Sequence, residues 1–361
     1  MDRCCVFIFE SKKGDEKMKK LIFLLIMLGI LLAACNSAPA TLTVMVTDSF
    51  AISKDVITEF ENANNVKLNF LMSGDAGSML NKAILTKNAP VADILYGLDN
   101  TFLSRALSEG IFDTYPSPLL QQIPDQFKLD KENQALPVDF GDVCINFDKQ
   151  YFSDKGLNIP ANLEDLTKPE YKGLLVVENP AISSPGLAFL LSTISEYGPD
   201  GFLGYWEKLK NNGVVVVNDW NTAYYTNFSG SSGKGPQPMV VSYGTSPAAE
   251  VVFANPKINE APTASLVGKN MCFRQIEFVG ILKGSKKMAL AEKFVDFMLS
   301  KRFQEDIPLN MFVFPANKTA ILPPEFSKYI QIPEQPAVLS PDQISANREK
   351  WIEAWRAEML Q

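Results

Sequence analysis

The sequence contains no histidine at any of its 361 positions. Catalytic triads and Cys–His pairs use an imidazole to take up and return a proton, and many zinc sites use it as a ligand. These classes of hydrolase and metalloprotein are therefore excluded. We expect no catalytic residue, no metal and no cofactor.

Cysteine is scarce, with five residues, and basic residues are fewer than acidic ones. The balance of 34 Lys and Arg against 41 Asp and Glu gives a net charge of −7. Such a surface repels DNA and RNA, so we expect no nucleic-acid partner. Cys144 and Cys272 each lie among apolar residues, where they form either a disulfide in an oxidising compartment or two small buried hydrophobic side chains. The sequence leaves both possibilities open.

Long apolar runs are absent, apart from a stretch of about a dozen residues at 21–32 that is too short to span a bilayer comfortably. Met18, Lys19 and Lys20 precede this stretch, and two alanines and Cys35 follow it. A basic start, an apolar centre and small residues are typical of a secretory signal peptide. The last residues resemble a bacterial lipoprotein signal, which implies cleavage before Cys35 and a lipid on its sulfur. The alternative is an ordinary signal peptide with a chance cysteine.

These features divide the N-terminal part of the chain. We predict a signal-peptide region at 1–34, with translation starting at Met18, and a short lipid-anchored tether at 35–41. The mature protein is then expected outside the cytoplasm, in the periplasm or on the cell surface, and tied to a membrane.

The rest of the chain alternates apolar strands with amphipathic helices. In the first part we expect strands at 42–46, 66–71 and 91–96, and helices at 52–63, 80–87 and 102–110. Further along the chain we expect strands at 137–147, 214–217 and 239–243, and helices at 187–197, 201–209 and 288–298, with apolar residues along one face of the last helix. This order predicts an α/β fold with mostly parallel sheets flanked by helices.

The two α/β units predict two lobes. Residues 42–138 plus 273–361 are expected to form lobe 1, and residues 139–272 lobe 2. Two strands that cross between the lobes would leave a ligand cleft that can close by hinge bending.

Several candidate ligand contacts lie at the ends of predicted strands, where α/β proteins bind their ligands. Asp48 and Asp99 are either carboxylates that face a cationic ligand or ordinary turn residues. Trp220 lies in a polar stretch and Tyr243 ends a strand, so core packing explains neither well. We expect both aromatic side chains in the cleft.

Six stretches carry a family resemblance. They are VTDSFA at 46–51, ADILYGLDN at 92–100, SSPGL at 183–187, WNTAY at 220–224, SYGTSPA at 242–248 and REKWIEAW at 348–355. Together they resemble the thiamine-binding, solute-binding proteins of bacterial ABC importers. The resemblance implies the two-lobe, type II periplasmic-binding-protein fold and a cleft for thiamine or thiamine phosphate. It also implies delivery to an ABC permease by a monomer without enzymatic activity.

The resemblance also implies site residues. The phosphate end of the ligand would meet Asp75, Ala76, Ser183, Trp220 and Tyr243. Helix N-termini expected at the first three of these positions present free N–H groups to an anion. Asp75 itself would repel a phosphate, so its backbone or a pairing with the cationic thiazolium ring is the better assignment.

Four aromatic positions of the family differ in this sequence. An expected Tyr is Thr47, another is Ala249, one expected Trp falls near Lys54 and another is Phe312. Only Phe312 keeps a ring to stack on the aminopyrimidine. Either other rings take over this stacking or the ligand is not quite thiamine. The candidate replacement rings are Tyr224, Phe50, Phe140 and Phe314.

Two alternatives use the same fold. Tyr224 and Tyr225 resemble the tandem phenolate ligands of ferric-ion-binding relatives, although the sequence has no His to join them. A thiamine-degrading enzyme would need a nucleophilic cysteine in the cleft. Cys144 is the candidate, although it lies inside a predicted strand.

Overall fold

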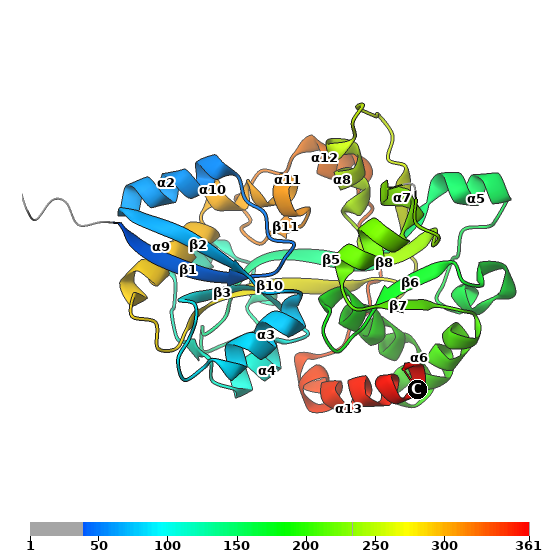
Figure 1. Ribbon diagram of the computed structural model, residues 1–361, viewed down its shortest axis with the longest axis horizontal. Helices are drawn as coiled ribbons and strands as arrows, with labels where there is room; N and C mark the ends of the chain where they lie inside the picture. Colours follow the sequence, from blue (N-terminus) through cyan, green and yellow to red (C-terminus); the bar gives the residue numbers. More distant parts are fainter. Residues whose placement is uncertain (1–38, 233, 361) are drawn as a thin grey trace, which may run out of the picture. The chain divides into compact units, whose positions relative to one another are not determined.

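The described part of the chain, residues 39–232 and 234–360 of the computed structural model, has an α/β fold, which confirms the predicted class. Residues Thr41–Gln361 form one compact unit (Figure 1). The predicted signal peptide and Cys35 lie outside the described residues. Within the described ranges, no helix combines the length and the apolar character that a membrane span requires.

Eleven strands of the described residues join one mixed sheet. They are β1 (Ala40–Val46), β2 (Val66–Met72), β3 (Ile94–Asp99), β4 (Phe112–Asp113), β5 (Leu136–Asp148), β6 (Leu175–Glu178), β7 (Val215–Val217), β8 (Met239–Tyr243), β9 (Thr263–Leu266), β10 (Phe273–Leu282) and β11 (Phe314–Pro315). The main path runs β2-β1-β3-β10-β5-β8-β6-β7. β1 and β3 are parallel, and β6 is parallel to both β7 and β8. β10 and β5 are antiparallel to each other and to β3 and β8, respectively.

The 13-residue strand β5 joins the two halves of this sheet. Its first part pairs with β10 from Leu136 to Val143, and its last part pairs with β8 from Val143 to Phe147. β10 pairs with β3 on its other side. In Figure 1, β5 and β10 run side by side through the centre, with β1–β3 on one side and β6–β8 on the other. These two strands therefore connect the two groups of strands.

Helices pack against the sheet and bury their apolar faces. The α-helices are α2 (Lys54–Asn64), α3 (Ala76–Leu85), α4 (Leu103–Ser108), α5 (Lys149–Lys155), α6 (Ser184–Asn211), α7 (Ser229–Ser232), α8 (Ser246–Phe253), α9 (Met288–Leu299), α10 (Lys301–Gln304), α11 (Ile307–Met311), α12 (Pro324–Tyr329) and α13 (Pro341–Met359). Short 3₁₀ turns lie at Pro118–Gln122, Asp125–Phe127, Glu164–Thr167 and Pro169–Tyr171, and Thr222–Asn227 is a π-helix.

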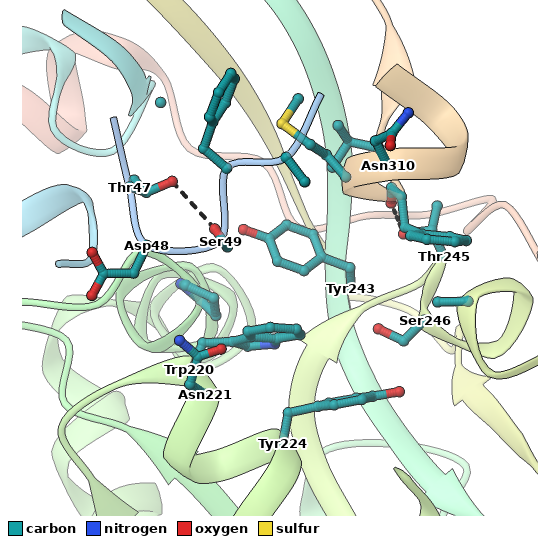
Figure 2. Close-up of a pocket in the computed structure, with 18 of the residues that line it drawn as sticks. Thr47, Asp48, Ser49, Trp220, Asn221, Tyr224, Tyr243, Thr245, Ser246 and Asn310 are labelled. Atoms are coloured by element: carbon teal, nitrogen blue, oxygen red, sulfur yellow. Dashed lines mark hydrogen bonds between the residues drawn. The ribbon is translucent and has the colours of Figure 1, made fainter. Parts of the chain in front are cut away.

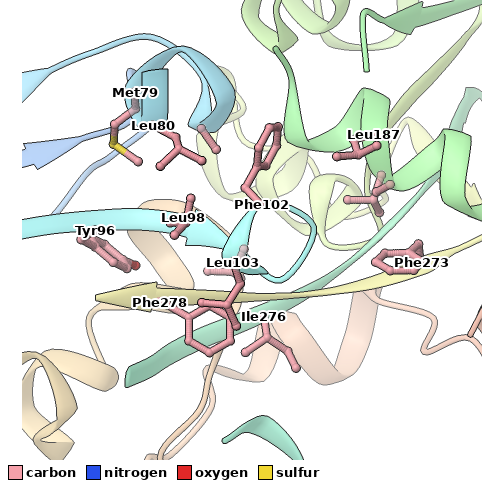
Figure 3. Packing of buried hydrophobic residues seen from close by; sticks show 14 of the residues in the cluster. Met79, Leu80, Tyr96, Leu98, Phe102, Leu103, Leu187, Phe273, Ile276 and Phe278 are labelled. Atoms are coloured by element: carbon pink, nitrogen blue, oxygen red, sulfur yellow. The ribbon is translucent and has the colours of Figure 1, made fainter. Parts of the chain in front are cut away.

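The core forms where these helices meet the central strands. Figure 3 shows Leu80 of α3, Leu98 of β3, Leu103 of α4 and Phe278 of β10 in one buried cluster. The apolar spacing that predicted a helix in 288–298 buries one face of α9, including Phe294 and its neighbours. This agreement follows because residues three and four apart share a helix face.

The start of one helix and the bend in another have identifiable causes. α13 starts with a capping box, in which Ser340 and Gln343 satisfy each other's backbone N–H groups. α6 changes direction at Gly198, whose φ of 73° is left-handed, so it consists of two helical segments as the sequence indicated. α13 packs on α6 through Trp355 and Trp206, whose rings meet edge to face at 5.5 Å. The C-terminal helix thus contacts the segment predicted as lobe 2, although residues 273–361 were assigned to lobe 1.

The third predicted strand, at 91–96, is wrong in its position. β3 begins three residues later and ends at Asp99, with all six of its residues buried. Tyr96 and Leu98 belong to this central strand, whose continuous burial on both faces hides the alternation that would mark its ends. Asp99 is therefore part of the strand and not of the loop that follows it.

Cys144 and Cys272 form a disulfide, with their Cα atoms 4.2 Å apart. Cys144 lies in β5, and Cys272 immediately precedes β10 at the point where the two strands pair. The bond resolves the choice that the sequence left open. It also leaves no free Cys144 thiolate, so the alternative of a Cys144 nucleophile is wrong for the disulfide-bonded protein.

Loss of this disulfide should destabilise the fold. Cys272→Ser is expected to lower the free energy of unfolding by about 2–5 kcal/mol, because the bond closes a loop over a sequence separation of 128 residues. Urea denaturation measures the change. The double variant Cys144→Ser/Cys272→Ser is the matched control and should lose the same amount, as should the wild-type protein under reducing conditions. Equal stability of reduced and oxidised wild-type protein would contradict the expectation.

Candidate functional site

A cavity of about 660 Å³ lies beside the central strands. Segments from the whole chain line it: the loop after β1, the first turns of α3, α6 and α8, the π-helix region, β10 and the end of α11. Figure 2 shows this cavity, with Thr47 and Ser49 on the side of the Tyr243 ring, whereas the Asp48 carboxylate points away from the rings and accepts a hydrogen bond from the Gly74 N–H. The expectation that strand ends and helix starts meet at one site agrees with this arrangement.

Stacked aromatic rings form one wall. The Trp220 ring lies between those of Tyr243 and Tyr224 in Figure 2. It stacks on Tyr224 at 5.0 Å with an angle of 17°, and it meets Tyr243 at 6.5 Å. Trp220 also donates a hydrogen bond from Nε1 to the Ser242 hydroxyl at 2.9 Å. This bond fixes the plane of the indole, which packs on Tyr224 with one face and lines the cavity.

The π-helix positions this wall. Asp219 precedes it and accepts hydrogen bonds from the backbone N–H and the hydroxyl of Thr222, both at 2.8 Å. The turn then places Trp220 and Tyr224 above one another. π-helical turns are rare and frequently occur at functional sites. The Tyr224 hydroxyl donates to Glu250 of α8 at 2.6 Å, which ties the wall to the next helix.

The charges in the cavity all have one sign. Four carboxylate residues line it, namely Asp48, Asp75, Glu250 and Glu277, and none of its described lining residues is Lys or Arg. Opposite charges attract strongly in a partly buried site, where water screens them less. The cavity therefore favours a cation, and its aromatic wall adds a further attraction for one.

Asp75 is the carboxylate at the start of α3. Its pKa is raised from 3.8 to about 6, first by burial and further by the charges of Asp219 and Asp48. One of its oxygens is buried without a hydrogen-bond partner in the described structure. Directly after it, Gly77 approaches Ile182 so closely that a Cβ atom would lie 2.8 Å from the Ile182 carbonyl oxygen. Only glycine allows the start of α3 to reach this position.

Phe312, another residue that lines the cavity, is held in an uncommon conformation. It follows α11 and has a φ of 56° in the left-handed region. The Thr245 hydroxyl donates a hydrogen bond to its carbonyl oxygen. A non-glycine residue in this region is strained, and such strain is concentrated at ligand sites. Thr245 thus holds the Phe312 ring at the cavity, where Phe253 packs against it at 5.1 Å.

Three helix N-termini also point to the cavity. Ala76, Ser184 and Ser246 are the first residues of α3, α6 and α8, and all three line it. The N–H groups of a first helical turn lack partners within the helix and favour an anionic group. The cavity thus combines a region suited to a cationic ring with a region suited to an anion.

The comparison with known proteins places the chain in a family. A family model described as bacterial extracellular solute-binding protein matches residues 89–347. The chain belongs to this family.

Known relatives of this solute-binding protein are similar over nearly their whole length. It is 31% identical over 333 residues to the thiamine-binding periplasmic protein of Brucella suis biovar 1 (strain 1330), covering 90% of this chain and 94% of the relative. It is 31% identical over 335 residues to the thiamine-binding periplasmic protein of Escherichia coli (strain K12), covering 90% and 96%. A solved periplasmic thiamin binding protein is 28% identical, with a TM-score of 0.77 and coverage of 90% and 98%. These matches confirm the predicted type II periplasmic-binding-protein fold and a role in solute binding outside the cytoplasm.

Seven of the nine predicted ligand-binding residues of this solute-binding protein line the cavity. They are Asp48, Asp75, Ala76, Trp220, Tyr224, Tyr243 and Phe312. Asp99 and Ser183 do not. Asp99 is fully buried and accepts hydrogen bonds from the Thr101 backbone N–H and the Ser184 hydroxyl. Ser183 is also fully buried, and its hydroxyl lies beside Asp75, where it lowers the pKa of that carboxyl against the effect of burial.

Two of the four candidate replacement rings line the cavity. Phe50 lies three residues after Thr47 and lines the cavity, as does Tyr224, whereas Phe140 and Phe314 do not. The sequence missed Phe253. It lies four residues after Ala249 on α8, hence on the same helix face, and both line the cavity. This helical spacing was the signal that could have identified it.

The tandem tyrosines have an arrangement that does not favour iron. Burial and then the nearby Glu250 charge raise the pKa of Tyr224 well above its ordinary value, and the same two causes raise the pKa of Tyr225. Both therefore resist the deprotonation that phenolate ligation of Fe(III) needs. The described residues also contain no cluster of three or more Cys, Asp or Glu that could hold a metal ion.

The raised pKa of Asp75 predicts how stability depends on pH. The folded protein holds a proton at Asp75 that the unfolded chain loses, so stability falls as the pH rises from about 4 to about 6 and stays lower above. Asp75→Asn removes this penalty and should raise the free energy of unfolding at pH 7 by on the order of 1–2 kcal/mol. The gain should vanish below about pH 4.

Chemical denaturation at several pH values measures this change. Asp200→Asn, which removes an exposed carboxylate outside the cavity, is the control and should show no such pH dependence. A variant Asp75→Asn that is less stable than wild type at pH 7 would contradict the expectation.

Proposed function

We propose that this solute-binding protein captures thiamine or thiamine phosphate in the described cavity and delivers it to an ABC permease. The relatives that are named as thiamine-binding periplasmic proteins support the ligand. The cavity supports it independently, through its shape and charge.

One observation carries the proposal: four carboxylate residues and a wall of stacked aromatic rings surround a cavity without Lys or Arg among its described lining residues. Thiamine has a permanently cationic thiazolium ring and a flat aminopyrimidine ring. The carboxylates suit the first ring, and the faces of Trp220, Tyr243 and Phe312 suit the second. A neutral sugar or an inorganic anion would leave this charge without a partner.

The phosphate of thiamine phosphate has a separate place in the cavity. It would lie at the helix N-termini that begin with Ala76, Ser184 and Ser246. Backbone N–H groups stabilise an anion without a basic side chain. This arrangement separates the two charges of the ligand.

The transport cycle needs two moving lobes. We propose that residues 42–138 plus 273–361 move as one lobe and residues 139–272 as the other, with β5 and β10 between them. Ligand contacts from both lobes would favour the closed state, which the permease recognises. No bond is formed or broken, so the protein acts as a binding protein and not as an enzyme.

Thiamine should stabilise the purified protein, and Trp220 should be needed for this. We expect a rise in melting temperature that grows with thiamine concentration, because ligand bound only to the folded state adds to stability. Trp220→Ala should weaken thiamine binding by tenfold or more, since it removes the stacking surface and leaves a gap. Trp220→Phe is the matched variant: it keeps a ring but loses the hydrogen bond to Ser242, and should lose less affinity.

The outcomes of this thermal-shift series separate the candidates. A rise in melting temperature with Fe(III), and none with any form of thiamine, would show that the ligand is iron and not thiamine. Unchanged thiamine affinity of Trp220→Ala would show that the cavity is not the binding site. Thiamine phosphate should shift the melting temperature as well if the helix N-termini hold the phosphate.

We also propose that a lipid on Cys35 anchors the protein, as a monomer, beside its permease. The support is the sequence pattern before Cys35 and the polar tether after it. When bacterial membranes are dissolved in a detergent that separates into two phases, the full-length protein should partition into the detergent phase. Cys35→Ala should move it to the aqueous phase, while Cys272→Ser, which also removes a cysteine, should not. A variant Cys35→Ala that stays in the detergent phase would contradict the anchor.

A further inference from the structure

A row of three carboxylate residues crosses the central strands below the cavity. Glu277 of β10 pairs directly with Asp99 of β3 on one side and with Asp139 of β5 on the other. Directly opposite residues of antiparallel strands point to the same face of the sheet, with Cβ atoms about 5 Å apart. Figure 3 shows β3 and β10 side by side, with Leu98 and Phe278, which pair with each other and are the chain neighbours of Asp99 and Glu277.

Only one member of the row reaches the cavity. Asp99 and Asp139 are fully buried, whereas Glu277 lines the cavity floor. The register of β10 shifts just after this point relative to both of its neighbours. The shift lies after Glu277 in the pairing with β5 and after Phe278 in the pairing with β3. Such irregularities re-aim side chains next to functional sites.

The surroundings of the row leave part of its charge without a partner. Asp99 accepts hydrogen bonds from Thr101 and Ser184. Asp139 accepts one from the Tyr96 hydroxyl at 2.5 Å, and its other oxygen is buried without a partner in the described structure. Like charges directly opposite each other in a sheet are destabilising. The empty site therefore needs protons on the row or a cation beside it.

No basic side chain supplies that cation in the cavity. Tyr96 and Tyr243 face the row, and Asp75 lies on the far side of Tyr243; none of these groups adds a positive charge. Arg348 of α13 acts on Asp99, but its guanidinium lies over the Phe102 ring at 4.3 Å and it does not line the cavity. Arg274 is engaged with Asp142 by two hydrogen bonds.

The titration of these groups agrees with this geometry. Burial, then the charges of Asp139 and Asp99, hold the pKa of Glu277 well above its ordinary value. Burial raises the pKa of Asp139 to about 7, although the hydrogen bond from Tyr96 opposes the rise. At neutral pH the empty row thus retains protons.

We propose that Glu277 is the carboxylate that pairs with the cationic ring of the ligand, and that the arriving cation displaces one proton from the row into the solvent. The inference rests on the proposed function, because it requires a cationic ligand such as thiamine. Protonated protein and the thiamine cation give the ion pair and one free proton, so charge and atoms balance. Affinity then rises with pH, by up to tenfold per pH unit while the empty row is protonated.

Calorimetry with thiamine tests the inference. At pH 7, in two buffers that differ in ionisation enthalpy, the wild-type protein should show a buffer-dependent heat that corresponds to the release of close to one proton. Its affinity should rise between pH 6 and pH 8. Glu277→Gln should abolish the proton release and weaken thiamine binding by tenfold or more. Glu353→Gln, which removes an exposed glutamate of α13 outside the cavity, should behave as wild type.

A second variant covers a failure of Glu277→Gln to fold. Asp139→Asn keeps Glu277 but removes its neighbouring charge, so Glu277 ionises more readily. This variant should bind thiamine at least as tightly as wild type and release fewer protons at pH 7. If the row had only a structural role, Asp139→Asn would not reduce the number of protons that are released when thiamine binds.

The outcomes separate this inference from the function on which it rests. Thiamine binding without proton release, or unchanged affinity of Glu277→Gln, would overturn the role of Glu277 and leave the thiamine proposal standing. No heat with thiamine in the wild-type protein would overturn the proposed function, and the inference would fail with it.

Discussion

The antiparallel pairing of β5 with β10 is the constraint on which the rest of the structure depends. β5 pairs with β10 over its first part and with β8 and β9 over its last part, so one continuous strand belongs to both groups of strands. The disulfide between Cys144 and Cys272 fixes the register at one end of the β5–β10 pair. A slip by one residue would turn every side chain to the other face, so this register decides what lies under the cavity.

The register places ionisable groups where a core would normally be apolar. Asp99, Asp139 and Glu277 lie side by side on central strands, and Tyr96 and Tyr243 flank them. Burial of charge costs free energy, and proteins usually remove this cost by pairing or by protonation. A row that holds protons in its empty state gains selectivity, because only a ligand that brings its own positive charge displaces them.

The sequence allowed much of the fold to be predicted, because alternation of strands and helices is a local signal. α9 shows this clearly, since the spacing of its apolar residues identified its buried face. The position of β3 was less predictable, because all of its residues are buried and its ends carry no change of pattern. Asp99 therefore looked like a loop residue, although it ends the strand and is fully buried.

The same distinction explains which site residues could be found. Trp220 and Tyr243 stand out because large aromatics at strand ends or in polar stretches lack a packing role. Glu277 gives no such signal, since its importance comes from residues 99 and 139, which are far away in the chain and adjacent only through strand pairing. The Cys144–Cys272 bond is equally non-local, because it depends on a Cα–Cα distance of 4.2 Å that only the fold provides.

Charge and shape then act on different parts of a ligand. The rings of Trp220, Tyr224 and Tyr243 offer stacking that many flat molecules could use, so on their own they would select weakly. The carboxylates select more strongly, because a neutral molecule of the same shape would leave their charge or their protons in place and gain no ion pair. The absence of Lys and Arg from the described lining of the cavity sharpens this choice, since no internal cation competes with the ligand. Selectivity for a cationic aromatic solute thus follows from what surrounds the central pair of strands.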